Sequence, residues 1–301
     1  MAGMNIQMKQ APWYTGGLAQ ALRPGANLGD VIYVDSNAGD DANLGRMPSE
    51  PVASFLRALA LSTNQRNDTI VVLDYWAAGT EAWPIVVDKE MVSIIGVPGA
   101  GAQWPQINPV GDNAAFSVTA LGVEICNLAV HSGATHGAIE LGASVWGIEI
   151  HNCTFGETAA CQDGIRGVAP FDPAYLKIWG CRFGQFITRN GVRLDHNATR
   201  GMIGVPGLEP NVFRMCQDVA IYINNTFAEG GIFDNRIDCG ADVQGRAITL
   251  DVTCVDHAFI DGNHASFGDT AMVANPYLDS AAAGSNTWGL NYRDITATLP
   301  V

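Results

Sequence analysis

The sequence is poor in charged residues, and in lysine above all. Charged residues make up 15% of the 301 positions, against about 25% in an ordinary globular chain, and the only lysines are Lys9, Lys89 and Lys177. Acidic residues outnumber basic ones by 30 to 16, which gives a formal net charge of −14. A protein that binds nucleic acid or an anionic lipid surface needs a basic face. The composition therefore argues against nucleic acid and against a membrane as partners.

The sequence also lacks the motifs of targeting, metal binding and nucleotide binding. The first twenty residues contain no apolar core of a signal peptide, and no apolar run reaches the ~18 residues of a membrane-spanning helix. The seven cysteines form no Cys-x-x-Cys pair, and the histidines form no metal-binding motif. No P-loop or dinucleotide fingerprint occurs, so no cofactor is expected. We expect a chain made in a cytoplasm, with reduced and buried thiols.

An internal repeat dominates the sequence. The pentapeptide Ile-Gly-Val-Pro-Gly occurs at positions 95–99 and again at 203–207, an offset of four times 27. Short stretches in which apolar and polar residues alternate, such as 116–118 and 248–250, lie between. Alternation with a period of two predicts strands. One further series recurs every 25–29 residues and consists of Ile125, Ile150, Ile178, Ile203, Ile232 and Ile260.

A repeat of this length with two or three short strands predicts an all-β fold, the parallel β-helix. Each repeat is then one coil, and each strand pairs with its counterpart in the next coil. An antiparallel sandwich or barrel would also have short strands and many turns, but it gives no reason for a recurrence every 27 residues. Two ladders are predicted along the coils: a tight corner of Asn127, Asn152 and Gly180, and an inward row of Cys126, Cys153 and Cys181.

The two ends of the chain differ from the repeat. A strand over 31–34 and an amphipathic helix over 51–61 predict a cap over residues 31–65, which covers the open edge of the first coil. The solenoid is predicted over residues 31–267. Residues 1–30 and 268–301 are predicted to be an N-terminal arm and a C-terminal arm or cap. The aromatic residues of these arms are expected to bind a partner, and they are Trp13, Tyr14, Trp288 and Tyr292.

The start of the repeat is familiar. The stretch Tyr33-Val-Asp-Ser-Asn-Ala-Gly-Asp-Asp-Ala-Asn-Leu-Gly45, followed by Ser54-Phe55, resembles the opening signature of right-handed parallel β-helix proteins of the pectate-lyase-like superfold. The stretch Ser93-Ile-Ile-Gly-Val-Pro-Gly99 resembles their early coils. The likeness covers residues 31–267, and it is weakly specific for function because one fold hosts many activities.

Within that superfold, the element Pro12-Trp13-Tyr14 and the compact length make the chain similar to β-helix proteins of tailed bacteriophages. That resemblance implies a place on the virion, as capsid decoration or as a tail component. It also implies a homotrimer in contact with the major capsid protein or another virion protein.

The working residues of the polysaccharide hydrolases and lyases of this fold are missing from the coils. No adjacent Asp pair, Gly-His-Gly or Arg-Ile-Lys occurs there. The remaining catalytic candidates are Asp195 and Asp251, which follow equivalent strands two coils apart, with Asp163 as a third. A separation of roughly 9–10 Å is at the wide edge of the range for an inverting glycosidase. Alternatively, these are corner residues whose side chains bond the local backbone.

Two further features allow a binding role. The loop over residues 35–45 holds Asp35, Asn37, Asp40 and Asp41, a weak calcium site, although Asx turns ahead of a helix also account for them. Tryptophans on consecutive coils could stack on a sugar, but core or oligomer contacts are the simpler use.

The sequence therefore predicts a non-enzymatic structural protein of a phage virion, most simply a capsid decoration protein. The alternative is a carbohydrate-active β-helix protein, such as a tailspike-like depolymerase, hydrolase or lyase. A third possibility is a glycan-binding or adhesion module.

Overall fold

The computed structural model describes most of the chain after residue 28. The described residues are 29–74, 81–98, 103–142, 145–157, 159–168, 174–195, 197–214, 216–238, 246–251, 254, 258–266, 276–280, 286–293 and 296–298. The predicted N-terminal arm, with Trp13 and Tyr14, lies outside them. Within these ranges no helix has the length and apolar composition needed to cross a bilayer.

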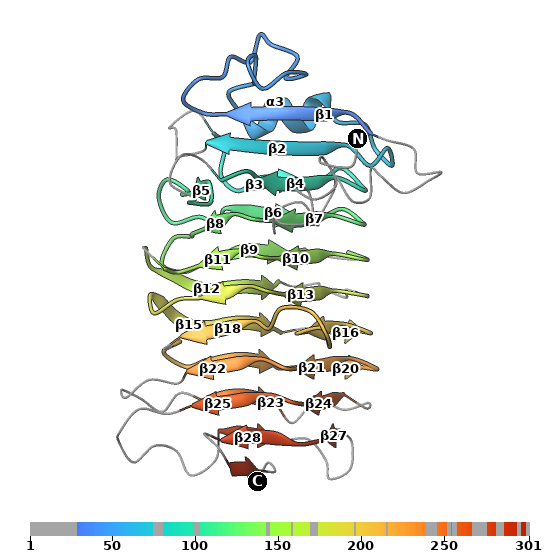
Figure 1. The fold of residues 1–301 in the computed structure, drawn as a ribbon, viewed down its shortest axis with the longest axis vertical. Helices are drawn as coiled ribbons and strands as arrows, with labels where there is room; N and C mark the ends of the chain where they lie inside the picture. The colour runs from blue at the N-terminus through green and yellow to red at the C-terminus, as the bar shows by residue number, and fades with distance from the viewer. Residues whose placement is uncertain are drawn as a thin grey trace, which may run out of the picture.

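Three parallel sheets run along the molecule, with coils stacked in chain order (Figure 1). Sheet A consists of β1 (Val31–Asp35), β2 (Thr69–Asp74), β4 (Ser93–Gly96), β7 (Glu124–Cys126), β10 (Glu149–His151), β13 (Lys177–Trp179), β17 (Met202–Ile203), β21 (Gly231–Phe233), β24 (Phe259–Asp261) and β27 (Thr287–Trp288). Sheet B consists of β3 (Ile85–Val87), β6 (Phe116–Val118), β9 (Gly137–Leu141), β12 (Cys161–Gly167), β15 (Ile187–Leu194), β19 (Val219–Ile223), β23 (Arg246–Leu250) and β26 (Tyr277–Asp279).

Sheet C consists of β5 (Gln106–Ile107), β8 (Ala129–Val130), β11 (Thr154–Phe155), β14 (Arg182–Phe183), β18 (Val212–Arg214), β22 (Arg236–Asp238), β25 (His264–Ser266), β28 (Asn291–Arg293) and β29 (Thr296–Thr298). A two-stranded sheet pairs β16 (Ala198–Thr199) with β20 (Phe227–Ala228). Within the described chain every strand pair is parallel except β28–β29. The predicted all-β parallel β-helix is confirmed, and the antiparallel sandwich is excluded.

The isoleucine series forms one inward ladder in sheet A. Ile125, Ile150 and Ile178 pair directly across β7, β10 and β13, and the ladder continues through the later members of the series. All of them are fully buried, because alternation along each strand turns them to the inside of the coil. The predicted series is therefore confirmed.

The repeated pentapeptide is out of register by one position. Both copies lie on sheet A, but the counterpart of Ile203 is Ile94, whereas Ile95 aligns with Cys126. Coil lengths vary, so two identical stretches of sequence need not occupy the same position in their coils.

The corner between sheets A and C turns at the predicted residues. Asn127, Asn152 and Gly180 have φ values of 58°, 53° and 63°. This left-handed backbone is open to asparagine and glycine, which explains the choice of residues.

The predicted row of three cysteines is wrong for Cys126. Cys153 and Cys181 follow the corner, and their thiols donate to carbonyls of the preceding coil, at Ile125 and Ile150. Cys126 precedes the corner and lies beside His151, on the outer side of sheet A. Although Cys126 and Cys153 are 27 residues apart, their positions within the coil differ by two residues.

Two further ladders stiffen the solenoid. Phe155, Phe183 and Phe213 stack with ring centroids 5.0 and 4.4 Å apart. Four fully buried asparagines lie in a row. The side-chain NH₂ group of each of the first three donates to the side-chain oxygen of the next. They are Asn211, Asn235, Asn263 and Asn291. Their amides also donate to backbone carbonyls of the preceding coil, so the buried polar groups are satisfied.

The first coil is closed by α3 (Phe55–Leu61). The helix begins at Phe55 because Ser54 caps it, accepting a hydrogen bond from the Arg57 amide. Phe55, Ala58 and Leu59 are buried against the first coils, and the Phe55 ring meets Phe116 edge-on at 5.6 Å. The strand of the predicted cap lies where the sequence placed it, whereas the helix, predicted over 51–61, begins four residues later because Val52 bridges to Val34 and Ser54 is the N-cap.

The solenoid continues past residue 267, where the sequence predicts its end. β26, β27 and β28 extend all three sheets, and β29 adds an antiparallel strand to sheet C. Trp288, predicted in an arm, lies on the last coil, and its indole N–H donates to Asp279 at 2.8 Å. Tyr292 pairs with His264 on β25. The predicted boundary at residue 267 is wrong because the strands that follow it contain no member of the isoleucine series.

The phenylalanine stack makes a direct stability prediction. Phe183→Ala should lower the free energy of unfolding by about 3–5 kcal/mol, because it opens a cavity in the middle of the stack. Phe186→Ala, three residues on and 41% exposed, should change it by less than about 0.5 kcal/mol. Urea denaturation followed by circular dichroism measures both. Equal losses would contradict the assignment of Phe183 to the core.

Candidate functional site

The predicted catalytic carboxylates gather on sheet B. Leu194, Ile223 and Leu250 pair across β15, β19 and β23, so Asp195 and Asp251 follow equivalent strand ends two coils apart. The equivalence expected from the sequence is therefore present. Whether these residues act in catalysis depends on what their carboxylates contact.

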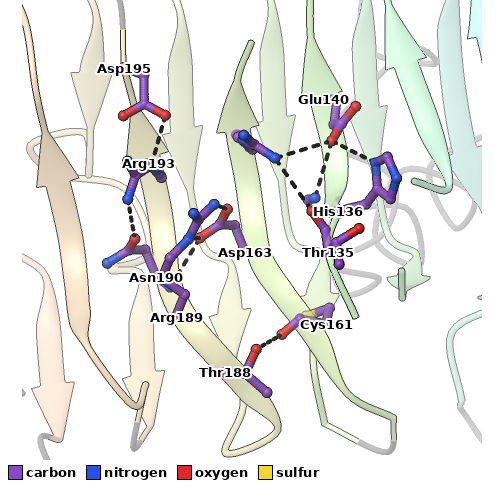
Figure 2. Close-up of polar contacts among 12 residues, drawn as sticks. Thr135, His136, Glu140, Cys161, Asp163, Thr188, Arg189, Asn190, Arg193 and Asp195 are labelled. Atoms are coloured by element: carbon purple, nitrogen blue, oxygen red, sulfur yellow. Dashed lines mark hydrogen bonds and ion pairs between the residues drawn. The ribbon is translucent and has the colours of Figure 1, made fainter. Parts of the chain in front are cut away.

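Each of the two carboxylates has a partner from its own or the intervening strand. The Arg193 guanidinium donates to Asp195 at 2.7 Å (Figure 2), and the Tyr222 hydroxyl donates to Asp251 at 2.7 Å. Arg193 also lies over the Tyr222 ring, 4.9 Å from its centroid. Burial and the hydrogen bond to Asp251 raise the pKa of Tyr222 to about 12. The space between the two aspartates is thus occupied by a cation and a protonated phenol.

Asp163 is placed differently. It lies in β12 and is fully buried, and it accepts hydrogen bonds from Nε and Nη2 of Arg189 and from the backbone N–H of Asn190, as Figure 2 shows. The Arg189 and Asn190 contacts come from the next coil. Asp163 therefore joins two coils rather than facing a groove.

The acidic residues of the 35–45 loop accept hydrogen bonds from the backbone of the cap and from Ser54. Asp35 accepts from the amides of Asn37 and Ala38, as in an Asx turn. Asp41 accepts from the amide and the hydroxyl of Ser54, just before α3. In the same loop, Asp40 accepts from the Ala42 amide. These contacts follow the local-bonding alternative, and the calcium site stays a prediction.

A cleft of about 520 Å³ opens at the corner between sheets A and C. Three consecutive corners, after β7, β10 and β13, are only two residues long. The connections on either side, β4 to β5 and β17 to β18, are longer, and each begins in a copy of the repeated pentapeptide. Trp104 lines the cleft from the first of these, and Leu208 and Glu209 line it from the second. The floor consists of Asn127, His151, Asn152, Cys153, Thr154, Trp179, Gly180 and Arg182.

His151 in the floor is held by a carboxylate and by a stacked ring. Its Nε2 lies 2.9 Å from Glu124 Oε1, and Glu124 Oε2 accepts from the Ser93 hydroxyl at 2.7 Å. The Trp179 ring stacks on the imidazole, with centroids 4.3 Å apart and planes 8° from parallel. His151 and Glu124 are both nearly buried. The carboxylate fixes one ring nitrogen and the stacked indole fixes the plane, which is how functional histidines are held in many proteins.

The same cluster includes Cys126. Burial and the neighbouring Glu124 raise the pKa of the Cys126 thiol well above its usual value. Glu124, Cys126 and His151 match no linear motif, so the sequence alone did not predict the cluster. The sequence feature that could have located the cluster is the pair of pentapeptides, because each copy begins one of the two long connections that enclose the cleft.

An exposed aromatic pair lies at another corner, between sheets B and A. The rings of Trp146 and Tyr175, 58% and 42% exposed, meet edge-on with centroids 6.3 Å apart. Arg200 donates to the Tyr175 hydroxyl and pairs with Glu229. Tyr175 has a φ of 60°, where the two preceding coils have Gly122 and Gly147. The partner of Trp146 is thus Tyr175.

Comparisons with known proteins add little beyond the fold. No family model matches the chain, and no curated protein matches it. Among solved structures, a GH136 lacto-N-biosidase from Eubacterium ramulus is similar, with 11% sequence identity and a TM-score of 0.37, over 88% of this chain and 68% of that one. A likeness this distant says nothing about activity. The parallel β-helix is established by the strand pairing itself.

The ion pair of the fully buried Asp163 on sheet B yields a stability prediction. Asp163→Asn should cost about 1–3 kcal/mol of unfolding free energy, because it removes the charged acceptor of the Arg189 and Asn190 hydrogen bonds at a fully buried position. Asp195→Asn should cost less than about 1 kcal/mol, since Asp195 and Arg193 are partly exposed. Thermal and urea denaturation of the two variants measure this difference. A larger loss for Asp195→Asn would show that the roles are reversed.

Proposed function

We propose that this chain is a non-enzymatic structural protein of a tailed-bacteriophage virion, which decorates the capsid exterior as a homotrimer and contacts the major capsid protein. The observation that carries the proposal is the internal use of the predicted catalytic carboxylates. Asp163 forms an ion pair with Arg189, Asp195 forms one with Arg193, and Asp251 accepts a hydrogen bond from Tyr222. The Arg189 and Tyr222 contacts join neighbouring coils, and Arg193 holds Asp195 beside its own strand.

The architecture supports this role. Backbone hydrogen bonds between coils run the length of the solenoid, so few polar groups need water. α3 covers one end of the solenoid, and β29 pairs along sheet C at the other. The helix over the first coil opposes end-to-end association at that end, which suits a protein that must attach to a shell without forming fibres. The similarity of the Pro12-Trp13-Tyr14 element to phage β-helix proteins points to the same setting.

Quantitative mass spectrometry of purified virions of the phage that encodes this chain tests the proposal. We expect a copy number comparable with that of the shell subunits, and a recombinant protein with the mass of a trimer. A handful of copies would place the protein in the tail instead, and its absence from particles would contradict the proposal. Depolymerisation of a polysaccharide that is lost in Asp195→Asn would favour the carbohydrate-active alternative.

A second candidate function, adhesion to a glycan, is favoured by the Trp146–Tyr175 pair. Exposed aromatic rings offer apolar faces for the C–H groups of a sugar ring, and Arg200 and Glu229 beside them offer hydrogen bonds. The left-handed backbone at Tyr175 costs about 1–2 kcal/mol, and glycine at this place would avoid that cost. Met91, Arg200 and Glu229 have the same left-handed backbone at equivalent corners, so the exposed ring is what distinguishes Tyr175.

Tyr175→Gly separates adhesion from folding. The variant removes the ring and relieves the left-handed strain, so its melting temperature should be unchanged or higher. Its affinity for the best-binding oligosaccharide of a glycan array should fall about tenfold or more, equivalent to about 1.4 kcal/mol. Met91→Gly, the same kind of substitution at another left-handed corner with φ of 58°, keeps both rings, Arg200 and Glu229, and should keep binding. An array without a hit, or equal binding by Tyr175→Gly, would rule this function out.

A further inference from the structure

The cluster on the outer side of sheet A has the composition of a metal site. Glu124 and Cys126 are the two ends of β7, and His151 ends the neighbouring strand β10, directly beside Cys126. One donor atom from each residue lies within 4.8 Å of the others. All three residues are less than a tenth exposed, although they lie on the outer side of the sheet.

We propose that Glu124, Cys126 and His151 bind a divalent transition-metal ion of the zinc type. A thiolate, an imidazole and a carboxylate are donors that zinc accepts, and three protein donors leave one position open. Two anionic donors also balance the charge of a divalent ion in a buried place. The basic group Lys177, one coil further on, does not neutralise these donors, because its Nζ binds Glu149 at 2.8 Å.

The surroundings of the cluster fit such a site. The Ser93 hydroxyl donates to Glu124 Oε2 and so orients the carboxylate. Trp179 fixes the plane of the imidazole by stacking. Outer contacts of this kind position metal ligands in known sites. The sheet thus holds the donors in place before any ion arrives.

The second nitrogen of His151 is a further feature of the cluster, because the ion would bind Nε2, the nitrogen beside Glu124, and leave Nδ1 to a ligand in the cleft. Nδ1 is buried, and it has no hydrogen-bond partner within the described chain. A buried polar nitrogen without a partner is costly and needs an explanation. His151 lines the cleft, which gives an ion or a ligand a route to the ring. The cleft also gives the open coordination position access to water or to a bound molecule.

This site is independent of the proposed virion role and of the aromatic pair. A purely structural role is the competing explanation, in which Glu124 and His151 form a buried ion pair and Cys126 is an inert thiol. The two explanations differ in whether the folded protein takes up metal with a sulfur ligand.

Cobalt(II) titration of the purified, chelator-treated full chain tests the proposal. We expect one ion per chain, with the charge-transfer absorption of a cobalt–thiolate bond, and displacement of cobalt by zinc. Zinc should also raise the melting temperature of the protein, since it binds the folded state. Cys126→Ser should lose the charge-transfer band, and His151→Gln should weaken zinc binding at least tenfold. Cys161→Ser removes an equally buried thiol from sheet B and should leave both unchanged.

X-ray absorption of the zinc-loaded wild-type protein decides the matter if the variants fail to fold. One sulfur and two nitrogen or oxygen ligands from the protein are expected. No uptake, a zinc ion without a sulfur ligand, or a cobalt–thiolate band that persists in Cys126→Ser would overturn the proposal.

Discussion

Parallel pairing of each strand with its counterpart one coil away is the constraint on which the whole structure depends. A single coil has short strands and cannot bury its own apolar side chains. Stacking at the ~4.8 Å spacing of paired strands brings equivalent side chains into contact. The isoleucine, phenylalanine and asparagine ladders follow from that one spacing, because residues at the same coil position have no other neighbours along the axis.

The same constraint decides where functional groups can gather. A side chain on the outer side of a sheet meets only those one coil before and after it, or two residues along its own strand. Glu124, Cys126 and His151 come together in this way, and so do Trp146 and Tyr175. The cleft beside His151 arises where the length of a connection changes between coils. The long connections after β4 and β17 enclose one because the three corners between them are short.

Repeating features were predictable from the sequence, and features that occur once were not. The isoleucine series and the corner at Asn127, Asn152 and Gly180 were predictable, because each coil needs an inward apolar residue and a left-handed turn. The asparagine ladder recurs as well, but asparagine is common in exposed turns, so its spacing alone does not reveal burial. Cys126 was placed wrongly because its spacing to Cys153 matches one coil length by coincidence. The partners of Asp163 and His151 lie 26 and 27 residues away, and no linear motif joins them.

The central claim is that the coils stack in parallel and in the register that aligns the isoleucine series. Spin labels on Met91→Cys and Glu229→Cys test it most directly. Both positions have the same left-handed corner conformation, five coils apart, and the native thiols in the described chain are buried. Pulsed electron paramagnetic resonance should give one narrow distribution of distances between the two labels. Once the length of the label linkers is allowed for, its centre should lie at ~24 Å, which is five strand spacings. A broad distribution, or a centre that no whole number of coil spacings can produce, would contradict the account.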